Sequence, residues 1–209
     1  MTDTGGTMGA ADGETCLQAR VLRIIRAEHD RLAAVVHAML NTMHTFEASG
    51  ATPDFRLLRA MLYYVSEFSE RVHHPKEDRF LFAPLRAAGS EMESVVAELE
   101  FQHTQAEVLQ RKLGHVLIRC EFEGPPSYAR LAALMADFSE FYYCHMQAEE
   151  DLVLPAARRL LSDCDWVQVE QAFAAAPDPA MPDEEASNFE RIYALIMEQI
   201  RGAEEQAPA

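Results

Sequence analysis

The stretch Val72-His73-His74-Pro75-Lys76-Glu77-Asp78 places a histidine and a carboxylate four residues apart, in a segment that otherwise has the apolar periodicity of a helix. The same spacing recurs in His145-Met146-Gln147-Ala148-Glu149. Residues i and i+4 share one face of a helix, with Cβ atoms about 5–6 Å apart. Each pair can therefore direct one nitrogen and one oxygen at the same metal ion.

An internal repeat contains these two pairs. His29 precedes His73 by 44 residues, and His103 precedes His145 by 42 residues. Each half of the repeat is a predicted helix with one histidine in its apolar stripe, followed by a predicted helix with an H-x-x-x-E pair. Two helical hairpins packed face to face would bring six side chains into one layer: His29, His73, Glu77, His103, His145 and Glu149.

The segments around the repeat have helical periodicity. Apolar residues recur at three- and four-residue steps in four segments, which are separated by Ser49-Gly50, Ala88-Gly89 and Gly124-Pro125-Pro126. Strand-like alternation does not compete with this pattern. Because short loops between helices favour antiparallel neighbours, we predict an all-α, up-down-up-down four-helix bundle with extra C-terminal helices.

The bundle is predicted for residues 15–162. Residues 1–14, rich in Gly, Thr and Ala, offer little to bury and are predicted to form a disordered tail. Residues 163–209 are predicted to form C-terminal helices that pack on the bundle, and a homodimer contact through the last helix is the alternative. Within the bundle, Pro75 lacks an amide hydrogen and predicts a kink between His73 and Glu77.

Charge and cysteine content restrict the functional classes. The net charge of −16 argues against nucleic acid and against an anionic membrane surface, because both require a basic face. No apolar run approaches the roughly 18 residues of a membrane span, and the first residues have no signal-peptide pattern. Four scattered cysteines without a C-x-x-C pair fit a reducing compartment. We therefore expect a cytoplasmic protein.

Histidines and glutamates are costly to bury without partners, and all six residues of the repeat interrupt apolar stripes. A metal centre gives all six a role, whereas the alternative is a metal-free core of hydrogen-bonded polar groups. Four imidazoles and two carboxylates suit iron, manganese or zinc. Each carboxylate could bridge two ions about 3.5–4 Å apart, which leaves coordination positions open. His74 is rotated about 100° from His73 and is expected at the surface or behind the ligands.

The order H…H-x-x-x-E…H…H-x-x-x-E over four helices resembles the hemerythrin-like, or HHE cation-binding, family. The His-His-Pro-Lys-Glu run before Phe80-Leu81-Phe82 and the later Asp165-Trp166 are also similar to it, and the resemblance covers roughly residues 17–175. It implies two iron ions, oxo- or carboxylate-bridged, with manganese and zinc as alternatives. It also implies which residues are the metal ligands. His29 and His103 would be terminal ligands, and His73 and His145 would bind from the second and fourth helices. Glu77 and Glu149 would be the bridging carboxylates.

The sequence departs from the oxygen-carrying hemerythrins in two places. Their third helix has a second histidine one turn after the first, where this chain has Glu107, and their fourth helix has an aspartate at the position of Glu150. Both glutamates are additional ligand candidates. Glu107 could also be a proton donor or an anchor for a histidine, and Glu150 could be solvated. With two H-x-x-x-E pairs, the pattern is nearer the iron–sulfur repair type of the family.

The resemblance implies a non-haem di-iron protein whose centre binds or reduces O2, NO or peroxide, in stress protection or iron handling. The corresponding enzyme class is a di-iron oxidoreductase that reduces peroxide or NO. The alternative is a sensor or carrier that binds such a small ligand without catalytic turnover. The expected partners are therefore a diatomic or peroxide ligand, without nucleic acid or membrane.

Overall fold

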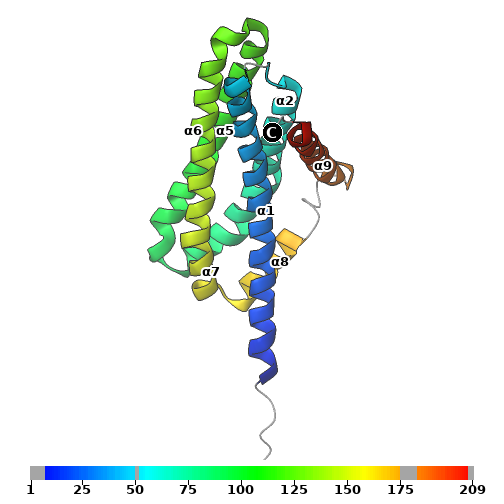
Figure 1. Ribbon diagram of the computed structural model, residues 1–209. Coiled ribbons are helices and arrows are strands. Elements are labelled where there is room, and N and C mark those ends of the chain that lie inside the picture. Colours follow the sequence, from blue (N-terminus) through cyan, green and yellow to red (C-terminus); the bar gives the residue numbers. More distant parts are fainter. Residues whose placement is uncertain (1–7, 50–51, 175–182, 207–209) are drawn as a thin grey trace, which may run out of the picture.

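The computed structural model describes residues 8–49, 52–174 and 183–206, which form a helical bundle (Figure 1). Its four antiparallel segments are α1 (Met8–Ser49), the run from α2 (Phe55–Phe68) to α4 (Ala83–Ala88), α5 (Glu93–Glu123), and α6 (Tyr128–Ala148) with α7 (Leu154–Leu160). Contacts join α1 to α2, α2 to α5, α5 to α6, and α6 back to α1. The predicted all-α bundle is confirmed, and its segments follow one another in chain order.

The first helix begins earlier than the sequence indicates. It starts at Met8, so residues 8–14 are helical, although the sequence analysis places a disordered tail at residues 1–14. These first turns extend beyond the end of the bundle (Figure 1). Extending an existing helix adds one hydrogen bond for each residue fixed, without a new nucleation cost, so little burial is needed. Residues 1–7 lie outside the described residues.

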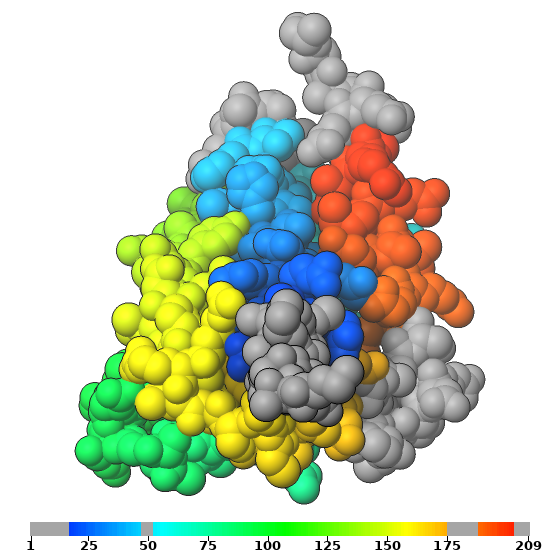
Figure 2. Space-filling view, turned by 90° about the horizontal axis from the view of Figure 1, so that it is seen from below, coloured from blue at the N-terminus to red at the C-terminus, as the bar shows by residue number. Residues whose placement is uncertain are grey.

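Two further helices pack against the bundle. Helix α8 (Asp163–Ala174) contacts α1, and α9 (Asp183–Gln206) contacts α2. Seen from below, α9 (orange to red) and the α6–α7 segment (yellow) lie on opposite sides of α1 (Figure 2). Phe189 and Ile196 of α9 are buried in the core, and Ile192 and Ile200 pack partly against it. The apolar edge that suggested a homodimer contact is thus used within the chain.

Among the described residues the core consists of two apolar clusters, which we call upper and lower because they belong to the upper and lower parts of the helices in Figure 1. The upper cluster includes Leu32, Val36, Leu58, Val65, Leu113, Leu131 and Phe138. The lower cluster includes Val21, Ile25, Leu81, Val96, Val153, Ala157 and Trp166. Each of the four segments passes from one cluster to the other, and the six polar side chains of the repeat lie in between. None of the described helices is long and apolar enough to span a bilayer.

Three π-helical turns occur within the second and fourth segments. They are η1 (Ser69–His73), η2 (Asp78–Phe82) and η5 (Glu149–Val153), and each ends two residues before a proline, namely Pro75, Pro84 or Pro155. A proline ring clashes with the carbonyl of residue i−4 in a regular α-helix, and a wider turn relieves that crowding. The predicted kink at Pro75 therefore takes the form of a π-turn, after which α3 (His74–Glu77) continues the segment.

Candidate metal centre

All six polar residues of the repeat converge in the layer between the two apolar clusters. His29 lies on α1, His103 on α5 and His145 on α6. The other three lie at the π-turns: His73 ends η1, Glu77 immediately precedes η2, and Glu149 begins η5. Each of these residues is at most 6% exposed. The wider turns thus set the positions of three of the six groups.

The Glu77 carboxylate faces three imidazoles. Its Oε1 atom lies 3.3 Å from His73 Nε2 and 3.5 Å from His29 Nε2. Its Oε2 atom lies 3.7 Å from His103 Nε2. The two oxygens of Glu77 are therefore directed at different histidines.

Glu149 has the same arrangement in the other half of the repeat. Its Oε1 atom lies 3.3 Å from His145 Nε2 and 3.7 Å from His103 Nε2, and its Oε2 atom lies 3.4 Å from His29 Nε2. Ligand atoms at about 2.1 Å from a metal ion lie about 3.0 Å apart at right angles and about 3.4 Å apart in a tetrahedron. The observed separations are close to those expected around a bound cation.

These distances divide the donor atoms into two sets, which we call the first and second positions. The first position comprises His29 Nε2, His73 Nε2, Glu77 Oε1 and Glu149 Oε2. The second position comprises His103 Nε2, His145 Nε2, Glu77 Oε2 and Glu149 Oε1. Each carboxylate contributes one oxygen to each position. The four residues of the first position have ligand atoms that all lie within 4.8 Å of one another.

A cation is the simplest partner for these atoms. The four Nε2 atoms and all four carboxylate oxygens are buried and have no hydrogen-bond partner within the described part of the chain. Leaving eight buried polar atoms unpaired would cost on the order of 10 kcal/mol, which is comparable to the whole stability of a domain. Protonation of the His29 and His103 imidazoles would provide hydrogen bonds to some of these oxygens, but it would compensate only part of that cost. The residues therefore fit the nitrogen- and oxygen-bound metal ions expected from the sequence.

Every one of the four imidazoles is oriented by a hydrogen bond from its other ring nitrogen. His29 Nδ1 donates to Glu150 at 3.0 Å, and His73 Nδ1 donates to Glu28 at 2.8 Å. His103 Nδ1 donates to Asp78 at 2.9 Å, and His145 Nδ1 donates to the side-chain oxygen of Gln102 at 3.0 Å. Such outer partners fix the tautomer and orient Nε2 toward a metal ion. In each case the partner comes from the adjacent segment of the bundle.

The neighbouring carboxylates favour protonated imidazoles at two places in the metal-free protein. Burial alone lowers the pKa of His29, but contact with Glu77 and its neighbours outweighs burial and raises that pKa to about 9. Burial likewise lowers the pKa of His103, and Asp78 with the site carboxylates raises it to about 10. Burial raises the pKa of Glu77, and the surrounding histidines outweigh this and lower it.

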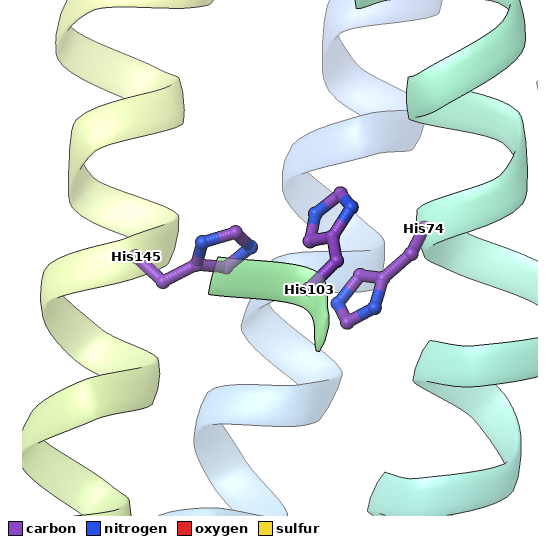
Figure 3. A group of neighbouring side chains, drawn as sticks. All are labelled: His74, His103 and His145. Carbon is purple, nitrogen blue, oxygen red and sulfur yellow. The ribbon is translucent and has the colours of Figure 1, made fainter. Parts of the chain in front are cut away.

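His74 is closer to the centre than the sequence analysis expects. It is buried, and its ring stacks face to face on His103, with ring centroids 3.9 Å apart and an interplanar angle of 6°. Figure 3 shows the imidazoles of His74, His103 and His145 gathered between their helices, and ligand atoms of the three lie within 4.8 Å of one another. An ion bound to an imidazole lies near its ring plane, so two parallel stacked rings cannot share one ion. The stacking therefore places His74 behind His103 and outside the two positions.

Replacement of His74 by phenylalanine is expected to leave the metal content unchanged, because a stacked ring remains while the nitrogens are removed. His103→Phe, the matched change on the facing ring, should lose metal because Nε2 of His103 belongs to the second position. Metal analysis of both purified variants checks this. Loss of one ion from His74→Phe would instead identify His74 as a ligand.

The two additional candidates have different locations. Glu107 does not face the centre, because its side chain is 46% exposed and pairs with Arg111 at 3.5 Å. Glu150 lies behind His29 and accepts a hydrogen bond from it, with Arg26 at 3.6 Å from its other oxygen. Neither residue therefore contributes to the two positions defined above.

Glu28, Asp78 and Gln102 are not among the residues predicted from the sequence, although all three contact the site histidines. Each is adjacent in sequence to one of the six converging residues, yet each contacts a histidine of a different segment. The sequence does contain a signal for them. A hydrogen-bonding residue stands directly before His29 and before His103, and another stands directly after each H-x-x-x-E pair. The repeat of this pattern in both halves could have identified these outer partners.

Comparison with known families agrees with this geometry. The family model of the hemerythrin HHE cation binding domain matches residues 20–157, about two thirds of the chain. The matched range begins in α1 and ends in α7, so it contains all six converging residues. No match was found among curated proteins.

Proposed function

Because the chain belongs to the hemerythrin HHE cation-binding family, we propose that it is a non-haem di-iron protein whose centre binds or reduces O2, NO or peroxide. The observation that carries this proposal is the division of both carboxylates between two positions. Two ions, each with two imidazoles and two carboxylate oxygens, would account for every donor atom. Glu77 and Glu149 would bridge the ions.

The four imidazoles and two carboxylates would hold iron, which would supply electrons to a small ligand, and four protein donors per ion would leave coordination positions open. The chain contributes the environment of that chemistry. The upper and lower clusters exclude water on both sides of the layer, and the outer partners hold each imidazole in one orientation.

We favour a redox role in stress protection or iron handling. The alternative is a sensor or carrier without turnover, and one contact favours it. Lys76 donates to Glu28, the outer partner of His73, at 3.1 Å and lies over the Phe173 ring of α8, 5.2 Å from its centroid. A shift of His73 on ligand binding would therefore reach α8, which packs on the outside of the bundle.

The proposal is tested by metal analysis of anaerobically purified protein, with optical spectra before and after O2, peroxide and NO. We expect two iron ions per chain and spectral changes with all or some of these ligands. Catalytic consumption of peroxide or NO would indicate the oxidoreductase, and a stable spectral change without turnover would indicate the sensor or carrier. The exposed His37 provides a control, since His37→Ala should retain metal that His73→Ala loses. Fewer than one ion per chain after iron-replete expression would contradict the proposal.

Metal affinity is expected to rise with pH between about 6.5 and 9. Metal binding requires neutral imidazoles, whereas His29 and His103 have pKa values raised to about 9 and about 10 in the metal-free protein. Their protonated forms stabilise the metal-free fold fully below the ordinary histidine pKa of about 6.5, and that stabilisation is lost as pH rises through the raised values. Up to about two protons must therefore leave on binding, and affinity should increase by up to roughly a hundredfold per pH unit.

Competition with a chelator of known pH dependence measures this slope. A matched variant is Asp78→Asn, which removes the largest contribution that raises the His103 pKa and should reduce the slope. An affinity that does not change over this pH range would contradict the expectation.

We also propose a reducing, cytoplasmic location, which is consistent with the free thiols of Cys120, Cys144 and Cys164.

A further inference from the structure

The outer partner of His73 belongs to a buried ion pair. His73 Nδ1 donates to Glu28 Oε2, and Lys76 Nζ donates to Glu28 Oε1 at 3.1 Å. The side chains of Glu28 and Lys76 are only 14% and 10% exposed. Phe173 of α8 lies against the ammonium group, 5.2 Å from ring centroid to Nζ. Little solvent screens this pair, so the carboxylate is held firmly against the imidazole.

The second half of the repeat replaces this ion pair by neutral residues. Gln102 directly precedes His103 as Glu28 directly precedes His29, and Ala148 lies three residues after His145 as Lys76 lies three residues after His73. The two histidines therefore have equivalent places in the fold but different outer partners.

The orientation of Gln102 is determined by a second hydrogen bond. Its Nε2 atom donates to Glu98 Oε1 at 3.0 Å, so its Oε1 atom accepts from His145 Nδ1. An amide oxygen carries no net charge, and the hydrogen bond it accepts is weaker than one accepted by a carboxylate. A carboxylate on the far nitrogen increases the basicity of a ligand imidazole. His145 is therefore a weaker donor to a metal ion than His73.

The remaining two histidines do not offset this difference. His29 donates to Glu150 and His103 donates to Asp78, so both have a carboxylate as outer partner. One of these histidines belongs to each position. The contrast between the positions thus comes from His73 in the first and His145 in the second.

We propose that Gln102 is a positioning residue that makes the two metal positions unequal, so that the first binds its ion more tightly than the second. This inference rests on the proposed di-metal function. A more basic donor also stabilises the higher oxidation state of iron, so the ion at the first position has the lower reduction potential. The second position is then the one that releases its ion first.

The test exchanges the outer partners between the two halves of the repeat. Anaerobic, metal-free full-length protein is titrated with Co²⁺, and the two binding steps are followed by visible absorption. The pair Glu28→Gln with Lys76→Ala should weaken only the tighter step, by roughly 10- to 100-fold. The pair Gln102→Glu with Ala148→Lys should strengthen only the weaker step by a similar factor. Gln105→Glu adds a charge to the same helix and should shift neither step, since none of the four histidines has Gln105 as a hydrogen-bond partner.

A spectroscopic measurement distinguishes the positions without reference to activity. With one equivalent of ⁵⁷Fe²⁺ per chain, the wild-type protein should show one main Mössbauer doublet, and the Gln102→Glu, Ala148→Lys variant should show two of similar intensity. Single variants Glu28→Gln and Gln102→Glu replace any double variant that does not fold. Two bound ions whose steps respond equally to both exchanges would overturn the inference but leave the di-metal proposal intact. A chain that binds neither metal would contradict the proposed function itself.

Discussion

Replacement of Glu77 by alanine is expected to abolish binding of both proposed metal ions, because its two oxygens belong to different positions. Glu77 faces His29 and His73 through one oxygen and His103 through the other. Loss of a shared ligand should exceed the 10- to 100-fold decrease in affinity typical of an outer partner. Metal analysis after gel filtration should fall from two ions to less than one per chain.

A matched control is available on α5. Glu107→Ala removes the same side chain from an exposed place where it pairs with Arg111, and it should retain both ions. Glu149→Ala should reproduce the loss seen with Glu77→Ala, because it occupies the equivalent place in the repeat. Full metal content in Glu77→Ala would show that the carboxylate does not bridge the positions.

Among the substitutions proposed here, replacement of Trp166 by alanine is expected to cause the largest decrease in the free energy of unfolding. Trp166 is 1% exposed and belongs to the lower cluster, where it holds α8 against the bundle. Removing a buried large aromatic side chain costs about 3–5 kcal/mol, which corresponds to a decrease in Tm of roughly 10 °C or more for a chain of this size. Thermal unfolding of the metal-free protein, followed by circular dichroism, measures the change.

Two variants separate the possible causes. Val167→Ala changes the next residue of α8, which is 42% exposed, and should cost less than about 1 kcal/mol. Trp166→Phe keeps an aromatic ring but removes a buried Nε1–H that has no partner among the described residues, so it should cost much less than the alanine change. A similar Tm for Trp166→Ala and Val167→Ala would contradict the assigned role.

The bundle and the six converging residues could be predicted because both follow from periodicity. A polar residue that repeatedly occupies an apolar stripe must face the core, and helical spacing then determines its neighbours on the same helix. Glu107 shows where this reasoning ends. It lies one turn after His103, but at that level Ala106 and Gln110 occupy the core-facing positions. The stripe drifts around the helix, and Glu107 reaches the surface.

The repeated pattern marks the outer partners in the sequence, but the histidine that each one contacts could not be predicted, because these contacts lie between helices. Glu28 and Asp78 are next to site residues in sequence, yet spacing along one helix directs them away from the centre. Which neighbouring histidine each reaches depends on the rotation of adjacent helices about their axes. The same limitation applied to His74, whose burial arises from stacking against a ring of α5.

The hydrogen bonds behind the histidines also constrain how the protein assembles. The bonds of His73 and His145 stay within their own halves of the repeat, whereas those of His29 and His103 cross from one half to the other. A helical hairpin alone would therefore contain one oriented histidine and one without its anchor. Neither hairpin is therefore complete before the two meet, so docking of the hairpins and orientation of His29 and His103 are coupled.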